Sequence, residues 1–148
     1  MAANPLENAI SYLRTHQVMT VATIGPAGLW AAAVFYASKQ FDIYFLSSAG
    51  ARHVQNLEQN PRVAGTIQED YSDWESIKGI QLEGPVQWLS GTERVDAIER
   101  YTEKFRFLRD APMAIQVAFQ KVNWYRITPD RLYFIDNSRG FGHRDRIL

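Results

Sequence analysis

The residues from Ile77 to Leu89 constrain the fold of this chain more than any other stretch. Apolar and polar side chains alternate along it, which is the period of a β-strand with one buried face. Gly84 and Pro85 interrupt the strand in its middle, and such a pair predicts a bulge or corner, because proline has no N–H for the strand ladder. A sheet that curls needs corners of this kind, so the stretch predicts a barrel rather than a flat sheet.

Shorter elements surround this strand. Asn4, Pro5 and Glu7 are typical of a helix start, with an N-cap, a proline in the first turn and a capping-box glutamate. Further helices are expected from Ala51, after Ser90 and after Pro112. The chain therefore favours one domain, a small closed or partly open antiparallel barrel with helices at its ends. Its other strands, the first three expected as a meander and the last two as a hairpin, are Val18–Ile24, Leu29–Ala37, Asp42–Leu46, Val63–Gln68, Val122–Ile127 and Leu132–Ile135.

The segment 42–63 predicts a strand, a tight turn and a short helix that stops before Pro61. Ser48 is the expected N-cap, and the first turn of such a helix offers unpaired N–H groups at the positive end of a dipole. Arg52 adds a fixed positive charge within one turn of that end. Together these groups predict an anion site, most naturally for a phosphate. An ordinary capped helix with a solvated arginine explains the same residues.

Composition excludes several kinds of function. Lys plus Arg and Asp plus Glu both number 16, and this balance argues against broad nucleic-acid or membrane-surface binding. The chain has no cysteine, which excludes disulfides and thiolate chemistry, so redox chemistry would need a bound cofactor. No metal site is expected, because the three histidines are too scattered for standard zinc spacing. Without a basic leader or a long apolar run, we expect a soluble, cytoplasmic protein.

Two stretches resemble the flavin mononucleotide (FMN)-binding split barrels, the superfamily that includes pyridoxamine 5′-phosphate oxidase. Ala51–His53 and Asn60–Val63 are similar to the family's Ser-Arg-Lys turn and its Asn-Pro-Arg-Val strand start. Lys78–Gly84 resembles the family's basic-x-apolar-x-apolar-x-Gly strand. The resemblance, which runs from Gln17 to Ser90, implies a mainly β (α+β) fold: a six-stranded antiparallel split β-barrel with helices at its ends, forming a single FMN-binding domain over residues 1–148.

Carried onto this chain, the resemblance implies a phosphate pocket and a ring pocket for FMN. Ser47 and Ser48 would line the ribityl phosphate, while Arg52 and His53 would pair with it. A phosphate favours a guanidinium, whose bidentate fork neither lysine nor histidine can offer. Lys78 would lie near the phosphate or the polar edge of the flavin, and the ring pocket would be shaped by Trp74, Tyr36 and Gln81. Each of these three ring-pocket residues also fits a core or surface role.

Differences between this sequence and the family's motifs narrow the prediction of which kind of family member the chain is. His53 stands where the family has lysine, and an unperturbed histidine is mostly neutral at pH 7. The C-terminal region lacks the Glu-Phe-Trp and Arg-Leu-His-Asp-Arg motifs of the oxidase. The chain is therefore not expected to be pyridoxamine phosphate oxidase itself, and it looks closer to the short, poorly characterised bacterial members.

The resemblance implies a homodimer with the flavin at its interface and hydride or electron transfer from a donor such as NAD(P)H or a small-molecule substrate. His143 and Arg144, near the C-terminus, are candidates to close over the ring and touch a substrate; a loose, solvated tail is the alternative. A second hypothesis is a non-catalytic binder of flavin, haem or a related planar ligand, acting in storage or sensing. A barrel that has lost its ligand is a third.

Overall fold

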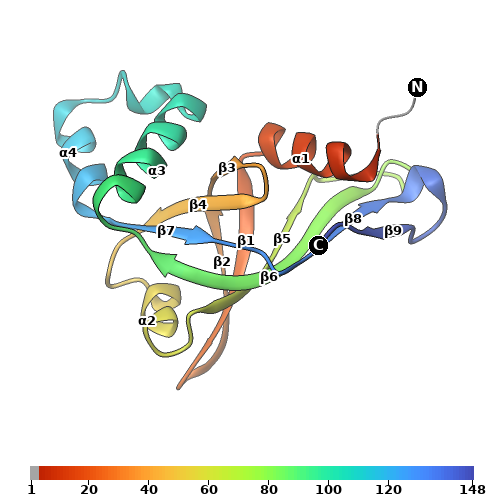
Figure 1. Cartoon of the computed structure of the whole chain (residues 1–148), viewed down its shortest axis with the longest axis horizontal. Helices are drawn as coiled ribbons and strands as arrows, with labels where there is room; N and C mark the ends of the chain where they lie inside the picture. Colours follow the sequence, from red (N-terminus) through yellow and green to blue (C-terminus); the bar gives the residue numbers. More distant parts are fainter. Residues whose placement is uncertain (1–3) are drawn as a thin grey trace.

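The computed structural model describes residues 4–148, and Figure 1 shows a curled antiparallel sheet with helices around it. In the described residues the sheet has nine strands, in the order β2-β1-β5-β6-β7-β4-β3, with β8 paired to β6 and β9 paired to β8. The molecule is a mixed α+β half-barrel, and it has more strands than the six that were expected. The strands are β1 (Val18–Gly25), β2 (Gly28–Phe35), β3 (Ala37–Lys39), β4 (Asp42–Ser47), β5 (Arg62–Gln68), β6 (Lys78–Trp88), β7 (Asn123–Ile127), β8 (Arg131–Asp136) and β9 (Arg144–Arg146).

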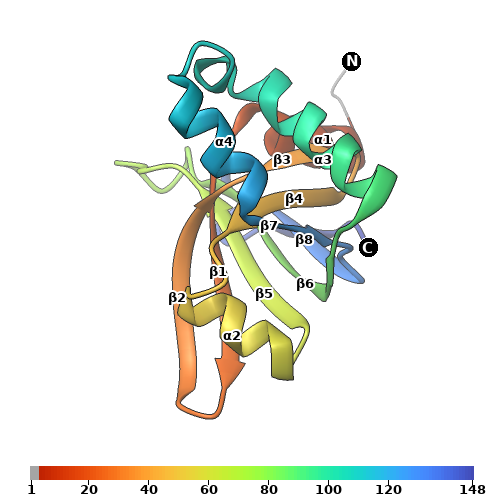
Figure 2. The ribbon, with the colours of Figure 1, turned by 90° about the vertical axis from the view of Figure 1, so that its left-hand side faces the viewer.

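The helices lie at the ends of this sheet, as predicted. In Figures 1 and 2, α1 covers one end, α3 and α4 lie together beyond β4 and β7, and α2 lies beside β1 and β2. The predicted start of α1 is confirmed, because the Asn4 side chain accepts a hydrogen bond of 2.8 Å from the backbone N–H of Glu7. The α-helices are α1 (Pro5–Thr15), α2 (Arg52–Gln59), α3 (Gly91–Lys104) and α4 (Met113–Lys121), with short 3-10 helices η1 (Arg106–Leu108) and η2 (Asn137–Arg139).

β6 bends at Gly84 and Pro85, which confirms the predicted corner. Its first half pairs with β8 and its last three residues pair with β7. The chain between β7 and β8 crosses directly over the bend: a Cβ at Gly84 would lie 2.5 Å from the backbone oxygen of Thr128. The expected hairpin of the last two strands is therefore wrong, because β7 and β8 each pair with a different half of β6 rather than with one another.

The expected meander of the first three strands is also wrong. The chain bends at Tyr36, so the run predicted as one strand splits into β2, which pairs with β1, and β3, which pairs with β4. Tyr36 is fully buried, and its hydroxyl donates a 2.7 Å hydrogen bond to the backbone oxygen of Leu13. This buried anchor explains the bend, which periodicity alone did not indicate.

Apolar side chains of the sheet fill the inside of the half-barrel. The inward positions of β5 and β6, among them Val63, Ile67, Ile80 and Leu82, are buried together with residues of α1, β1 and β4. A second cluster packs α3 against β3, β4 and β7 around Trp124. Because the inside of a small barrel is occupied by side chains, the candidate sites are clefts at its surface.

Candidate functional site

Arg52 is held at the start of α2, where residues 4–148 give it no negative partner. One Nη2–H donates to the backbone oxygen of Ala27 at 3.2 Å, and the guanidinium carbon lies 4.4 Å from the centre of the Trp30 ring. Its Nε is buried with no hydrogen-bond partner, and no carboxylate of the described residues forms an ion pair with it. A positioned cation with an unsatisfied donor is suited to an anion.

The N-cap of α2 differs from the prediction. The helix begins at Arg52 with Ala51 as N-cap, and no side chain caps it. Ser48 lies a full turn earlier, where its backbone oxygen accepts a hydrogen bond from the N–H of Ala51, and its side chain is exposed. The exposed Ser48 hydroxyl and the uncapped first turn of α2 both lie close in sequence to Arg52.

Ser47 and His53 lie together beside this turn. The Ser47 hydroxyl is 2.8 Å from Nε2 of His53, which is 8% exposed. Burial lowers the pKa of His53, so the imidazole is neutral at pH 7 and adds no charge for a phosphate. Arg52 is therefore the source of positive charge in this cluster, and His53 orients Ser47.

Lys78 and Trp74 lie elsewhere, at a cleft of about 820 Å³. The backbone oxygen of Lys78 accepts a hydrogen bond from the Tyr12 hydroxyl, and the exposed Trp74 ring meets Phe141 edge-on at 5.8 Å between centroids. The volume falls in the range of small-molecule sites. The walls come from α1, the loop before β6 and the tail: Tyr12, His16, Glu69, Tyr71, Asp73, Trp74, Glu75, Ser76, Lys78, Asn137, Ser138 and Gly140.

The cleft carries more acidic than basic side chains. Nε2 of His16 lies 2.8 Å from a carboxylate oxygen of Glu69. Hydrogen bonds from Ser76 lower the pKa of Asp73, which keeps this carboxylate charged. With Glu75, the cleft has three carboxylates, whereas its basic side chains are Lys78 and His16. The cleft is therefore suited to a neutral or positively charged ring system rather than to a phosphate.

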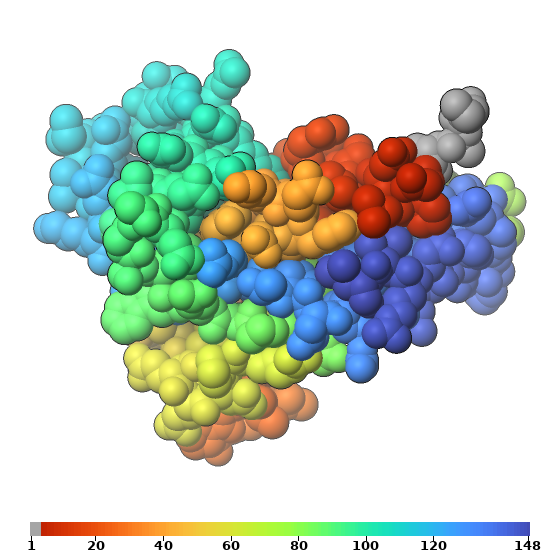
Figure 3. Space-filling model, in the orientation of Figure 1, coloured from red at the N-terminus to blue at the C-terminus, as the bar shows by residue number. Residues whose placement is uncertain are grey.

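One chain does not bring Arg52 and Lys78 together. Trp30, beneath Arg52, pairs with Thr23 near the Val63 end of β5, whereas Gly79, next to Lys78, pairs with Gln68 at the other end. Five residues of strand separate these positions, or about 15–20 Å. Figure 3 shows α2 and the tip of the β1–β2 hairpin as a projecting lobe, with the tail at a distant edge.

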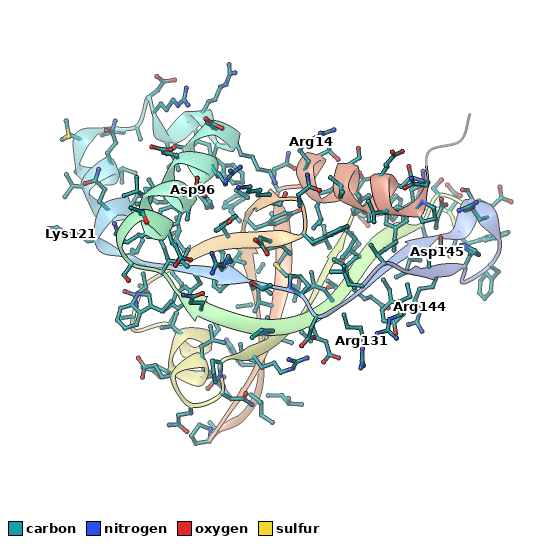
Figure 4. The ribbon with its side chains drawn as sticks, in the orientation of Figure 1. Arg14, Asp96, Lys121, Arg131, Arg144 and Asp145 are labelled. Atoms are coloured by element: carbon teal, nitrogen blue, oxygen red, sulfur yellow. The ribbon has the colours of Figure 1, made fainter. Side chains whose placement is uncertain are left out.

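Gln81 and Arg144, predicted for different roles, are neighbours on the outer face of the sheet. Nη1 of Arg144 donates to the side-chain oxygen of Gln81 at 3.3 Å, and its guanidinium stacks 4.3 Å from the centre of the Tyr133 ring. Figure 4 shows Arg144 and Arg131 projecting from the same side of β8 and β9. Tyr36, in contrast, is in the core, which corrects its expected place in a ring pocket.

The C-terminal region is ordered rather than loose. β9 pairs with β8, and the N–H of Ile147 donates to the backbone oxygen of Leu132 at 2.8 Å. His143 lies 3.1 Å from a carboxylate oxygen of Asp145 and is not among the residues that line the cleft, whereas Asn137 is. Sequence reasoning missed Asn137, which donates to the backbone oxygen of Trp74 and so fixes the loop; no periodicity marks it.

The described residues offer neither a metal site nor a helix that could span a membrane. No group of three His, Asp or Glu side chains between residues 4 and 148 is arranged to hold a metal ion. Over the same range, no helix has both the length and the apolar character to cross a bilayer.

Comparison with known proteins identifies relatives that match most of the chain. The family model described as pyridoxamine 5′-phosphate oxidase matches residues 6–136. A UPF0306 protein of Klebsiella pneumoniae (strain 342) is 31% identical over 137 residues, covering 90% of this chain and 86% of the relative. A UPF0306 protein of Enterobacter sp. (strain 638) is 32% identical over 135 residues, covering 90% of this chain and 89% of that one.

Solved structures share the fold at low identity. A haem-binding protein of Mycobacterium smegmatis superposes with a TM-score of 0.76 at 22% identity, over 100% of this chain and 59% of that chain. The haem storage protein HutZ of Vibrio cholerae gives 0.72 at 18% identity, over 88% and 94%. An FAD-binding protein of Mesorhizobium loti gives 0.67 at 16%, over 88% and 92%. Because the family model covers most of the chain, the protein belongs to the pyridoxamine 5′-phosphate oxidase-like family of split barrels.

Proposed function

We propose that the protein is an FMN-binding oxidoreductase that works as a homodimer, with Arg52 of one chain and the Lys78 cleft of the other holding a single flavin. The observation that carries the proposal is Arg52, whose buried Nε lacks any partner in the described chain. A phosphate with a charge of about −1.5 to −2 would satisfy this donor and the uncapped N–H groups of the α2 start. The Ser47 hydroxyl, oriented by His53, would be a further donor.

The distance between the two sites is the argument for two chains. On one chain, about 15–20 Å of packed sheet separates the Arg52 cluster from the Trp74 cleft, and a second chain could place its own cleft directly beside Arg52. The outer strand β2 offers a surface for a second copy: it is an edge strand of apolar residues, with Leu29 79% exposed and Phe35 also exposed. Uncovered apolar edges of this kind mark interaction surfaces.

The flavin would supply hydride or electron transfer, with NAD(P)H or a small molecule as the other reactant. The chain's own residues would bind and orient it. Arg52 and Ser47 would hold the phosphate, Trp74 would provide an apolar wall for the ring, and Lys78 would donate to its polar edge. The acidic side chains of the Lys78 cleft would repel the flavin's phosphate, so that the ring system rather than the phosphate enters the cleft.

Titration with FMN tests the proposal directly. We expect saturable binding, with Arg52→Ala weakening it by about 10- to 100-fold, because a hydrogen bond to a charged group contributes about 1.5–3 kcal/mol. Arg14→Ala is the matched control, since Arg14 is an exposed arginine on α1 (Figure 4). Bleaching of bound FMN by NADPH, with turnover on reoxidation, would support an oxidoreductase. Equal FMN affinity in wild type and the Arg52 variant would overturn the phosphate assignment.

A non-catalytic binder of flavin or haem is the second candidate, and the haem proteins among the structural neighbours favour it. The histidines of this chain do not decide between the two ligands. His16 has both ring nitrogens engaged, by the backbone oxygen of Tyr12 and by Glu69. A haem iron requires an axial ligand, and a metal-binding histidine commonly directs its other ring nitrogen to a carboxylate, which is the arrangement of His143 and Asp145. A titration with haemin separates the two, because a sharp Soret band that His→Ala variants remove would favour haem.

A further inference from the structure

A separate cavity of about 530 Å³ lies where the end of β6 meets α3 and the end of α4. Its size falls in the range of small-molecule pockets. Figure 4 shows Lys121 at this edge, where α4 ends and β7 begins. None of its lining residues belongs to the Arg52 cluster or to the Lys78 cleft. The walls are formed by Trp88, Leu89, Ser90, Arg94, Lys121, Val122 and Asn123.

The charge of this cavity is positive. Two cations, Arg94 and Lys121, line it, and no carboxylate of the described chain does. Nη2 of Arg94 donates to the backbone oxygens of Gln120 and Val122, which fixes the guanidinium in place without neutralising it. Lys121 is exposed and forms no ion pair within residues 4–148. Two unneutralised cations match a phosphate dianion better than a single carboxylate.

One wall of the cavity is an aromatic ring. Trp88 is 67% exposed, which is unusual for a tryptophan and leaves the indole free to stack. The same residue and Asn123 also border a smaller pocket of about 140 Å³, whose other walls are mainly apolar side chains of α2 and β6. The hydroxyl of Ser90 does not cap α3 and is available as a donor.

We propose that this cavity binds a phosphate ester of a flat heteroaromatic compound, a nucleoside monophosphate being the simplest example. The phosphate lies between Lys121 and Arg94, with the Ser90 hydroxyl as a further donor. The base stacks on Trp88, an interaction that tolerates any base because every base has a π-face. The site shares no lining residue with the Arg52 cluster or the Lys78 cleft, and Asn123, the strand partner of Ser47, separates it from the flavin site.

Calorimetric titration with AMP, adenosine and inorganic phosphate tests this proposal on the full chain. We expect AMP to bind more tightly than either adenosine or phosphate, and Lys121→Ala to weaken AMP binding by about tenfold or more. Trp88→Ala weakens AMP and adenosine but leaves phosphate binding unchanged. Lys39→Ala is the matched control, because Lys39, at the β3–β4 turn, is also an exposed lysine that forms no ion pair with another described residue. Circular dichroism verifies the fold of each variant.

Repeating the AMP titration with saturating FMN separates the two sites. Independent binding, with Lys121→Ala leaving FMN affinity unchanged, supports two sites. AMP affinity that is the same in wild type, Lys121→Ala and Trp88→Ala overturns the proposal, as does the absence of AMP binding. Competition between FMN and AMP that Lys121→Ala relieves would also overturn it, because FMN itself would then occupy this cavity. An Arg52→Ala variant that loses FMN binding but keeps AMP binding shows that the AMP cavity does not depend on the flavin site, so that each proposal is tested by its own result.

Discussion

The two ends of the β5–β6 pair are built differently. At the α2 end, Arg52 is fixed by Trp30 and a backbone carbonyl, and the surrounding groups are packed and half-buried. At the other end, the Lys78 cleft is wide, acidic and walled by a loop and the tail. The first is suited to one small anionic group, and the second to the body of a ligand. A molecule with a phosphate at one end and a ring at the other matches both, provided that two chains supply them.

The bend in β6 lies at the α2 end of this pair, where Gly84 is opposite Val63, and breaking it has the largest expected effect. Gly84→Val would place side-chain atoms against the backbone of Thr128 and Pro129, which cannot move without breaking the pairing of β7 or β8. We expect a loss of about 3 kcal/mol in the free energy of unfolding, measured by urea titration. Gly50→Val is the control, because a Cβ at Gly50 meets nothing within 4 Å. Equal losses in both variants would show that the corner is not the constraint.

The C-terminal segment 138–148 contributes to the walls of the Lys78 cleft and not to the Arg52 cluster. Deleting residues 138–148 removes β9 and the partly buried Ile147 and Leu148, so we expect a loss of about 2 kcal/mol in unfolding free energy. Arg144→Ala removes an exposed side chain and should cost less than about 1 kcal/mol. Thermal unfolding of both variants measures the difference. If the truncated chain is as stable as wild type, the tail does not belong to the folded sheet.

How much of this fold the sequence predicted depends on the physical origin of each element. Gly84 and Pro85 marked the corner because both residues have backbone requirements that can be recognised locally. β9 was missed because Arg144–Arg146 has no apolar alternation and is held by backbone pairing with β8. The split at Tyr36 was missed because it follows from a buried hydrogen bond to Leu13, a residue distant in sequence.

The candidate site shows the same limit. The turn that carries Arg52, Ser47 and His53 is local in sequence, so its residues were found together. Lys78 was assigned to the same ligand from resemblance, but its distance from Arg52 depends on strand register, which the motif does not contain. Trp30, which supports the guanidinium, was missed because nothing in an apolar strand marks one side chain as a stacking partner.

Mixing two variants, each of which lacks one part of the proposed flavin site, tests whether the Arg52 cluster and the Lys78 cleft bind the same FMN molecule. An Arg52→Ala chain and a Trp74→Ala chain should each bind FMN weakly. In a mixed dimer, one site would combine the intact Arg52 of one chain with the intact Trp74 of the other. We therefore expect an equimolar mixture, after unfolding and refolding together, to recover about a quarter of all sites at wild-type affinity. No recovery in a mixture shown to contain mixed dimers would mean that each flavin contacts a single chain, or that the two ends are unrelated.

The smallest expected effect concerns acid stability at the Arg52 end. Burial lowers the pKa of His53 in the folded chain below its ordinary value of about 6.5, so between the two values the unfolded chain binds more protons. The stability contributed by the neutral imidazole is fully present above pH 6.5 and is lost as the pH falls. His53→Gln keeps a polar partner for Ser47 but cannot titrate. We therefore expect the melting temperature of wild type to fall more between pH 7.5 and 5.5 than that of His53→Gln. Because the two proteins differ only at position 53, the difference between the two curves isolates His53, and parallel curves would show that its burial has no energetic consequence.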